Sequence, residues 1–169
     1  PKSRKGEQPR EYQLRVLSAA EIKQRLDIER LQLIDDLKKI LKDQIADRKD
    51  VDAVIEHLNR GNAFETSERG QVAEAEALQQ QIIRKTLGLR SKFEDLVNRY
   101  QANSLDTPED STRLQVIITT LDSLGTGKMP EAARFIADAS IARSEEDRMG
   151  DLKDASARQL EVIAELQAL

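Results

Sequence analysis

Residues 71–100 read QVAEAEALQQQIIRKTLGLRSKFEDLVNRY. In this stretch, apolar or small side chains recur every three or four residues, which is the spacing of one face of an α-helix. These positions are Val72, Ala75, Leu78, Ile82, Thr86, Leu89, Phe93, Leu96 and Tyr100. The spacing predicts a helix over about 67–102 that buries one continuous face against other helices.

A second long helix is predicted before this one, over about 18–59. Ser18 and Glu21 have the spacing of a capping box, in which each side chain accepts a backbone N–H at the start of a helix. Gly61 follows the predicted end and can take the positive φ that ends helices. The predicted buried positions are Ile22, Leu26, Leu33, Leu37, Ile40 and Gln44, broadened by Leu31, Ile34, Leu41 and Ile45 and resumed by Val51, Val54, Ile55 and Leu58.

The polar run 47–50 interrupts that face of the first helix in the sequence pattern, and we expect a break in the buried stripe there. A polar connection over about 61–70 joins the two long helices. Long helices joined by a short connection pack side by side in opposite directions. The sequence therefore predicts a long antiparallel, coiled-coil-like hairpin over 18–102.

Three shorter helices are predicted over 103–169. Thr107 can cap the first of them, and Pro108 suits its first position. We expect this helix to stop at Gly125-Thr-Gly127, a fourth to restart at Lys128-Met-Pro130, and a fifth to begin near Asp147 or Asp151. Their predicted buried positions are Leu114, Ile117, Ile118, Leu121, Leu124, Ala132, Ala133, Phe135, Ile136, Ala139, Leu152, Ala155, Gln159, Ile163 and Leu166.

Composition narrows the classes of protein that fit. The chain has 169 residues without cysteine, which excludes disulfide scaffolds and cysteine-ligated metal sites. Its net charge of −4 argues against a general nucleic-acid binder. No window approaches the roughly 20 continuous apolar residues of a membrane-spanning helix.

The fold class that these patterns predict is all-α, an antiparallel helical bundle built on the long two-helix hairpin with three shorter helices. Residues 1–17 are predicted to be a basic leader or linker, 18–102 the hairpin, and 103–169 the shorter helices that pack on it. We expect the last two parts to form a single domain. No segment alternates with a period of two, so no sheet is predicted.

Three groups of residues could form a functional site, and for each of them we favour a purely structural role. Gly125-Thr-Gly-Lys128 lacks the first glycine and the final Ser or Thr of a phosphate-binding loop, and we interpret it as a turn between helices. His57 is the single histidine, with Val54 where a di-iron bundle places a glutamate, and we interpret it as a surface residue. The carboxylates at 145–154 lack the spacing of a calcium loop.

The basic leader is the fourth candidate. Its cations could touch phosphates or anionic lipid headgroups, but Glu7 and Glu11 weaken that interpretation. A solvated linker is the simpler prediction. The cations are Lys2, Arg4, Lys5, Arg10 and Arg15.

From about residue 84 onward, the chain carries a set of cap and apolar residues. The set comprises Asn103, Leu105, Asp106, Pro108, Glu109, Arg113-Leu114, Leu121-Asp-Ser-Leu124, Met129-Pro-Glu-Ala132 and Gln159-Leu-Glu-Val-Ile163-Ala-Glu-Leu166. This half of the chain is similar to a recurring helical region in large, uncharacterised membrane-anchored proteins of planctomycete-like bacteria. The resemblance implies a structural segment on the extracytoplasmic, periplasmic side, and it implies no catalytic residue.

The leading hypothesis is a non-enzymatic structural or protein-interaction module within a larger bacterial envelope-associated protein. We expect a protein partner or self-association through a helical face, as a monomer or homodimer. We expect no nucleic acid, no cofactor and no direct membrane insertion by this segment, and we assign no catalytic, cofactor-binding or metal residue.

Alternatives remain open. One is an intracellular scaffold or regulatory bundle, which would place the chain in the cytoplasm. Another is a cation-binding or enzymatic domain that uses the acidic face at 145–154. A third is membrane or nucleic-acid contact through the basic leader.

Overall fold

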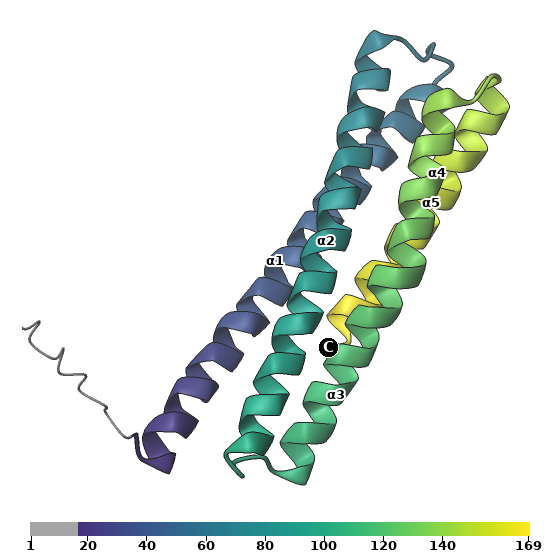
Figure 1. Ribbon diagram of the computed structural model, residues 1–169. Coiled ribbons are helices and arrows are strands. Elements are labelled where there is room, and N and C mark those ends of the chain that lie inside the picture. Colours follow the sequence, from purple (N-terminus) through teal and green to yellow (C-terminus); the bar gives the residue numbers. More distant parts are fainter. Residues whose placement is uncertain (1–16) are drawn as a thin grey trace, which may run out of the picture.

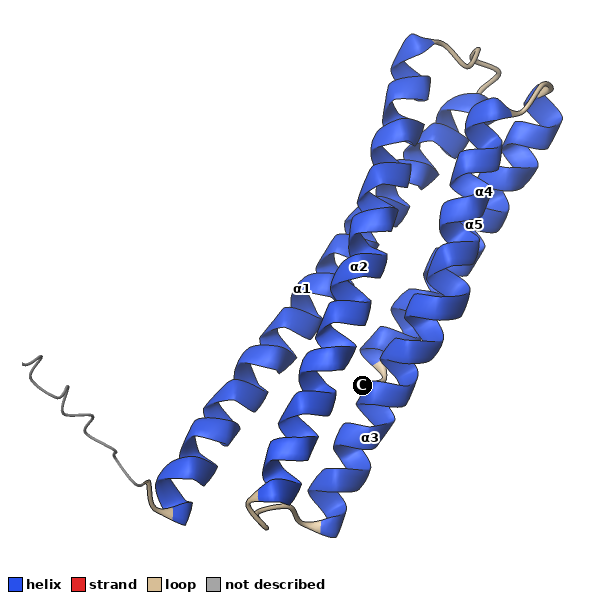
Figure 2. Ribbon diagram, viewed as in Figure 1, coloured by secondary structure: helices blue, strands red, loops and turns tan. Residues whose placement is uncertain are grey.

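The computed structural model describes residues 17–169, and these residues form helices joined by short loops (Figure 1). The helices are α1 (Ala19–Asn59), α2 (Thr66–Ala102), α3 (Pro108–Ser123), the π-helical segment η1 (Leu124–Lys128), α4 (Met129–Ile141) and α5 (Glu145–Gln167). Figure 2 shows no strand in this part of the chain, and the predicted all-α class is confirmed.

The helices pack as four parallel or antiparallel rods, because α3, η1 and α4 follow one another without a loop (Figure 1). α1 packs against α2 and α5, and α4 packs against α2 and α5. Each rod thus occupies one corner of a bundle, with α1 and the α3–α4 rod at opposite corners. The predicted leader lies outside the described residues, apart from Leu17.

The predicted break at 125–127 is wrong. Leu124–Lys128 forms one wide π-helical turn, so the residues interpreted as a turn between two helices continue the rod from α3 into α4. The prediction of three separate shorter helices is corrected accordingly. Local glycine and proline signals suggested a stop, but packing against α2 holds the backbone helical here.

Pro130 accounts for the wide turn, and close packing on α2 accounts for the glycine at position 125. Pro130 has no N–H to donate, and its ring crowds the preceding turn of a regular α-helix. A π-helical turn relieves such crowding inside a helix. Gly125 is required by close packing, because a Cβ there would lie 2.7 Å from Cδ2 of Leu87 on α2.

Helix ends follow the predicted capping chemistry at two positions. At the start of α1, the backbone N–H of Glu21 donates to Ser18 Oγ over 3.2 Å, and the N–H of Ser18 donates to Glu21 Oε2 over 2.9 Å. At the start of α3, Thr107 Oγ1 accepts the N–H of Asp110 over 3.1 Å. The predictions of both caps are confirmed, and Gly61 takes a φ of +79° after α1.

The predicted start of the last helix is wrong by at least two residues, because α5 begins at Glu145 with Ser144 as its cap. Ser144 Oγ accepts the N–H of Asp147 over 3.0 Å and donates to Asp147 Oδ2 over 2.7 Å. The cap therefore lies before the acidic residues 145–147, which occupy the first turn of α5.

We expect Ser144→Ala to lower the free energy of unfolding by about 1 kcal/mol, since it leaves a helix N–H without its acceptor. Urea denaturation followed by circular dichroism would measure the change. Ser91→Ala is the matched control, because Ser91 is exposed within α2 and caps nothing. Equal midpoints for the two variants would contradict the assignment of Ser144 as the cap.

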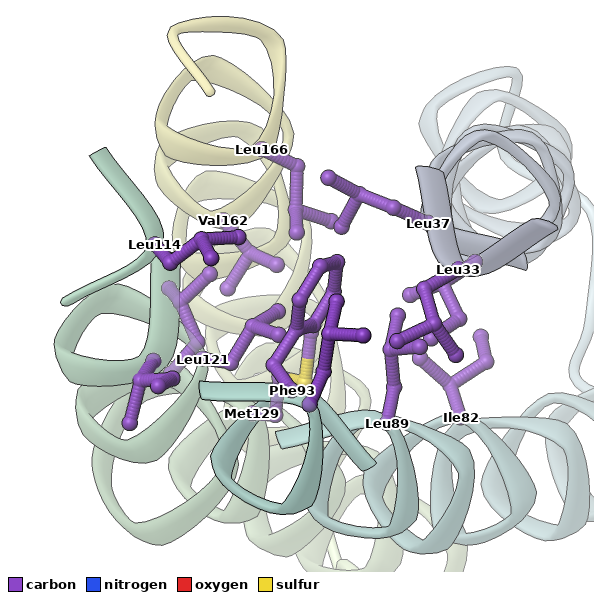
Figure 3. Packing of buried hydrophobic residues seen from close by; sticks show 14 of the residues in the cluster. Leu33, Leu37, Ile82, Leu89, Phe93, Leu114, Leu121, Met129, Val162 and Leu166 are labelled. Carbon is purple, nitrogen blue, oxygen red and sulfur yellow. The ribbon is translucent and has the colours of Figure 1, made fainter. Parts of the chain in front are cut away.

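The buried side chains form two apolar clusters along the bundle. One cluster lies beside the loop between α1 and α2 and contains Val51, Val54, Phe64, Val72, Ala75, Ile136, Ala139, Leu152 and Ala155. The larger cluster surrounds Phe93 (Figure 3) and draws on α1, α2, the α3–α4 rod and α5. On α1, α2 and α5, the residues between the two clusters include fully buried polar side chains.

Candidate functional site

A groove of about 500 Å³ opens between α1 and α3, next to the C-terminal end of α5. Its apolar lining comes from Leu31 and Ile34 on α1, Val116 and Ile117 on α3, and Leu169 beyond α5. Leu31 is 60% exposed and Val116 is 55% exposed. Exposure of this degree is unusual for large aliphatic side chains that lie close together on one face.

The groove lies along the part of α1 that extends past the last residues of α5. Gln159 of α5 bonds Asp47 of α1, so the two antiparallel helices are aligned at these residues. With that alignment, roughly the first 18 residues of α1, about 27 Å of helix, extend beyond α5. Figure 1 shows α5 ending partway along the bundle, while α1 and α3 continue past it.

Charged side chains at the groove are already paired. Arg30 Nη1 lies 3.3 Å from Asp110 Oδ1, an ion pair that links α1 to α3. Arg113 Nη2 lies 2.6 Å from Glu109 Oε1 on the same helix. The groove therefore offers an apolar surface bordered by neutralised ion pairs, which suits an amphipathic helix better than a charged ligand.

A second feature is a layer of four buried polar side chains, Gln44, Asp47, Gln79 and Gln159, which we call the polar layer. All four are 0% exposed. The amides of Gln44 and Gln79 bond each other in both directions, over 2.9 and 3.1 Å. Gln159 Nε2 donates to Gln79 Oε1 over 3.0 Å and to Asp47 Oδ2 over 2.8 Å. The layer thus links α1, α2 and α5 through one connected network.

The polar layer corrects two sequence predictions. The run 47–50 does not interrupt the buried face of α1, because Asp47 lies inside it. On α2, Gln79 is buried and the predicted Leu78 is only half-buried. Gln44 and Gln159 were predicted to face the core, and this is confirmed. Their hydrogen bonds to Gln79 and Asp47 were not predicted.

Asp47 carries the largest electrostatic perturbation in this layer. Burial raises the pKa of its carboxyl group from 3.8 to about 7, against the hydrogen bond from Gln159, which acts in the opposite direction. The nearby Asp50 adds to the increase in the pKa. No lysine or arginine side chain is recorded within ion-pair distance of Asp47 among the described residues.

Arg148 is a buried residue that the sequence analysis did not identify. Its Nε donates to the carbonyl oxygen of Ala139 over 3.2 Å, at the end of α4. Its guanidinium lies 4.1 Å from the centre of the Phe64 ring. The carbonyl end of α4 and the face of the Phe64 ring both stabilise the positive charge of Arg148. Arg148, which belongs to α5, therefore holds together α4, α5 and the loop before α2.

His57 lies in the last turn of α1, where the sequence predicted it. Its Nε2 is 3.4 Å from Glu68 Oε1, and its side chain is 39% exposed. The hydroxyl of Ser67 donates to Glu68 and, as the main cause, lowers the pKa of that carboxyl group. The pair is a local contact between the ends of α1 and α2.

The acidic residues at 145–154 lie along the first turns of α5. Partial burial, with the neighbouring Asp138, Asp147 and Asp154, raises the pKa of Asp151. Over residues 17–169, no three His, Asp or Glu side chains gather in a way that could hold a metal ion. The same part of the chain has no helix that is both long and apolar enough to span a membrane.

Gly125-Thr-Gly-Lys128 is inside a helical rod and forms no loop. Lys128 Nζ lies 2.9 Å from Glu161 Oε2 and 2.6 Å from Glu165 Oε1 on α5. The hydrogen bond to Glu165, the larger cause, and that to Glu161 raise the pKa of Lys128. This lysine therefore holds α5 to the rod, and the leader cations lie outside the described residues.

Comparisons with protein-family models, with curated proteins and with solved structures found no match for this chain. The groove and the polar layer are therefore the features of this chain from which a function can be inferred.

Proposed function

We propose that this chain is a non-enzymatic structural and interaction module that self-associates through the groove between α1 and α3. The observation that carries the proposal is the pair of exposed aliphatic side chains there, Leu31 and Val116, which line the groove beside the last residues of α5. In this proposal, the α1–α2 hairpin is the structural base, and the groove is its contact face.

A second copy of the chain suits the groove because the first turns of α1 are themselves an amphipathic helix. Ile28, 49% exposed, and Leu31 are three residues apart and share one outer face of α1. In a two-fold dimer, α1 of each copy can lie in the groove of the other, so the same contact covers both grooves. The paired charges of Arg30 and Arg113 place no like-charge repulsion in that contact.

The expected result is a concentration-dependent dimer. Light scattering over a range of concentrations should show the mass rise from 19.1 kDa towards twice that value. Leu31→Glu should weaken the dimer at least about tenfold, because it places an unpaired charge in an apolar contact. Circular dichroism should show the same helix content for wild type and variant.

Ile141→Glu is the matched control, because Ile141 is 78% exposed at the end of α4, far along the bundle from the groove. It should dimerise like the wild type. A mass of one chain at every concentration would overturn self-association. A dimer that Ile141→Glu weakens and Leu31→Glu leaves unchanged would place the contact elsewhere.

The resemblance to helical regions of membrane-anchored bacterial proteins adds a setting to this proposal, in which such a module spaces or joins domains outside the cytoplasm.

A further inference from the structure

The polar layer separates the two apolar clusters of the core. On α1 it lies between Ile40 and Val51, and on α5 between Ala155 and Val162. The α4 rod contributes the small buried residue Ala132 between its own cluster residues. A carboxyl group placed here is surrounded by apolar side chains on both sides along the bundle, and ionising it in such a place is costly.

Two oxygens of this layer have no hydrogen-bond partner among the described residues, Asp47 Oδ1 and Gln159 Oε1. These two residues already share the bond from Gln159 Nε2 to Asp47 Oδ2. If Asp47 were ionised, both of the oxygens would be acceptors that lack a donor. A proton on Asp47 Oδ1 converts one of them into a donor, and a carboxylic acid facing an amide can then bond it in both directions.

We infer that Asp47 is a neutral carboxylic acid paired with the amide of Gln159 in the folded chain, and that loss of its proton to solvent loosens α5 from α1. The acid donates to Gln159 Oε1 and accepts from Gln159 Nε2. The polar layer is thereby a proton-dependent contact between helices far apart in the sequence. This inference is independent of the groove and of self-association.

The surroundings of Asp47 support a neutral acid. α1 packs against α2 and α5, and at this level those helices present the amides of Gln79 and Gln159. On α1 itself, Asp50 adds a like charge, whereas Arg48 is engaged by Asp52 and by Ser156. The raised pKa of Asp47, about 7, agrees with this geometry.

The lysine on α2 nearest in sequence to Gln79, Lys85, pairs with an aspartate other than Asp47. Asp43 on α1 accepts from Lys85 on α2 over 2.8 Å. The lysine is therefore occupied at the surface of the bundle. Along α1, α2 and α5, all of whose residues the structure describes, no lysine or arginine lies within ion-pair distance of Asp47.

The sign of the pH dependence follows from the raised pKa in the folded state. Protonated Asp47 stabilises the folded chain fully at pH values below 3.8, its ordinary pKa. This stabilisation decreases as the pH rises and is lost once the pH has passed about 7, the pKa of Asp47 in the folded chain. Between pH 5 and pH 8, the ionisation of Asp47 should lower the ratio of folded to unfolded chain about 100-fold. Above about pH 8, the group contributes no further change.

Asp47→Asn is the decisive variant, because asparagine keeps the shape and the amide pairing and does not titrate. Urea denaturation of wild type and variant at pH 5, 6, 7 and 8 should show the variant gaining relative stability as the pH rises. Asp95→Asn on the exposed face of α2 is the control and should keep the wild-type pH dependence. Parallel pH curves for wild type and Asp47→Asn would overturn the inference.

A second measurement keeps the inference testable if Asp47→Asn folds poorly. The carboxyl ¹³C resonance of Asp47 in labelled wild-type protein should report the protonated form at pH 5.5 and titrate near neutrality. Amide hydrogen exchange in α5, corrected for the intrinsic rate, should lose protection across the same pH range. A chemical shift that shows an ionised Asp47 carboxylate at pH 5.5 would overturn the inference.

Discussion

Phe93→Ala should lower the free energy of unfolding by about 3–5 kcal/mol, among the largest losses expected from a single substitution in this chain. Phe93 is 0% exposed and lies at the centre of the larger cluster. Figure 3 shows it over Met129, with Leu37 of α1 and Val162 of α5 on other sides. Removing the ring takes contacts from every rod of the bundle and leaves a cavity in the core.

Urea denaturation followed by circular dichroism would measure this loss. Phe93→Leu keeps most of the apolar volume and should cost less than half as much. Ile141→Ala, at a side chain that is 78% exposed, should change the free energy of unfolding by less than about 0.5 kcal/mol. A Phe93→Ala variant as stable as Ile141→Ala would mean that the rods do not meet around residue 93.

The buried face of α2 was predictable because it depends on local spacing alone. A helical period places Ile82, Phe93 and Leu96 on one side of the helix whatever covers them, and all three are buried. Capping is similarly local, so Ser18 and Thr107 were identified correctly. Both kinds of prediction depend only on the identity of residues within a few positions along the chain.

The features that were missed depend on partners far away in the sequence. Asp47 is buried because Gln159, 112 residues later, bonds it, and its own neighbours give only a polar run. Gly125 lies inside a helical rod and packs against Leu87 of α2, 38 residues earlier in the sequence. The groove lies between residues of α1 and α3 that are far apart in the sequence, and no local pattern predicts their contact. No site residue was predicted, and both candidate features arise from such long-range pairing.

Gln79→Leu should cost about 2–5 kcal/mol, because it removes the residue to which two other amides bond. Gln44 loses both of its bonds to Gln79, and each unsatisfied buried polar group costs about 1–3 kcal/mol. Gln159 keeps its bond to Asp47. Urea denaturation would measure the change, with Gln80→Leu on the exposed side of the same helix turn as the control.

The double variant Gln44→Leu and Gln79→Leu tests whether the cost comes from unpaired groups or from lost contacts. If unpaired groups dominate, the double variant should be more stable than Gln79→Leu alone by at least about 1 kcal/mol, since both partners are removed together. Strict additivity of the two single losses would contradict the reciprocal pair. A polar layer costs stability relative to an apolar one but fixes how helices align. A double variant with wild-type stability and a lower urea m-value would therefore show that this pair sets alignment more than it adds stability.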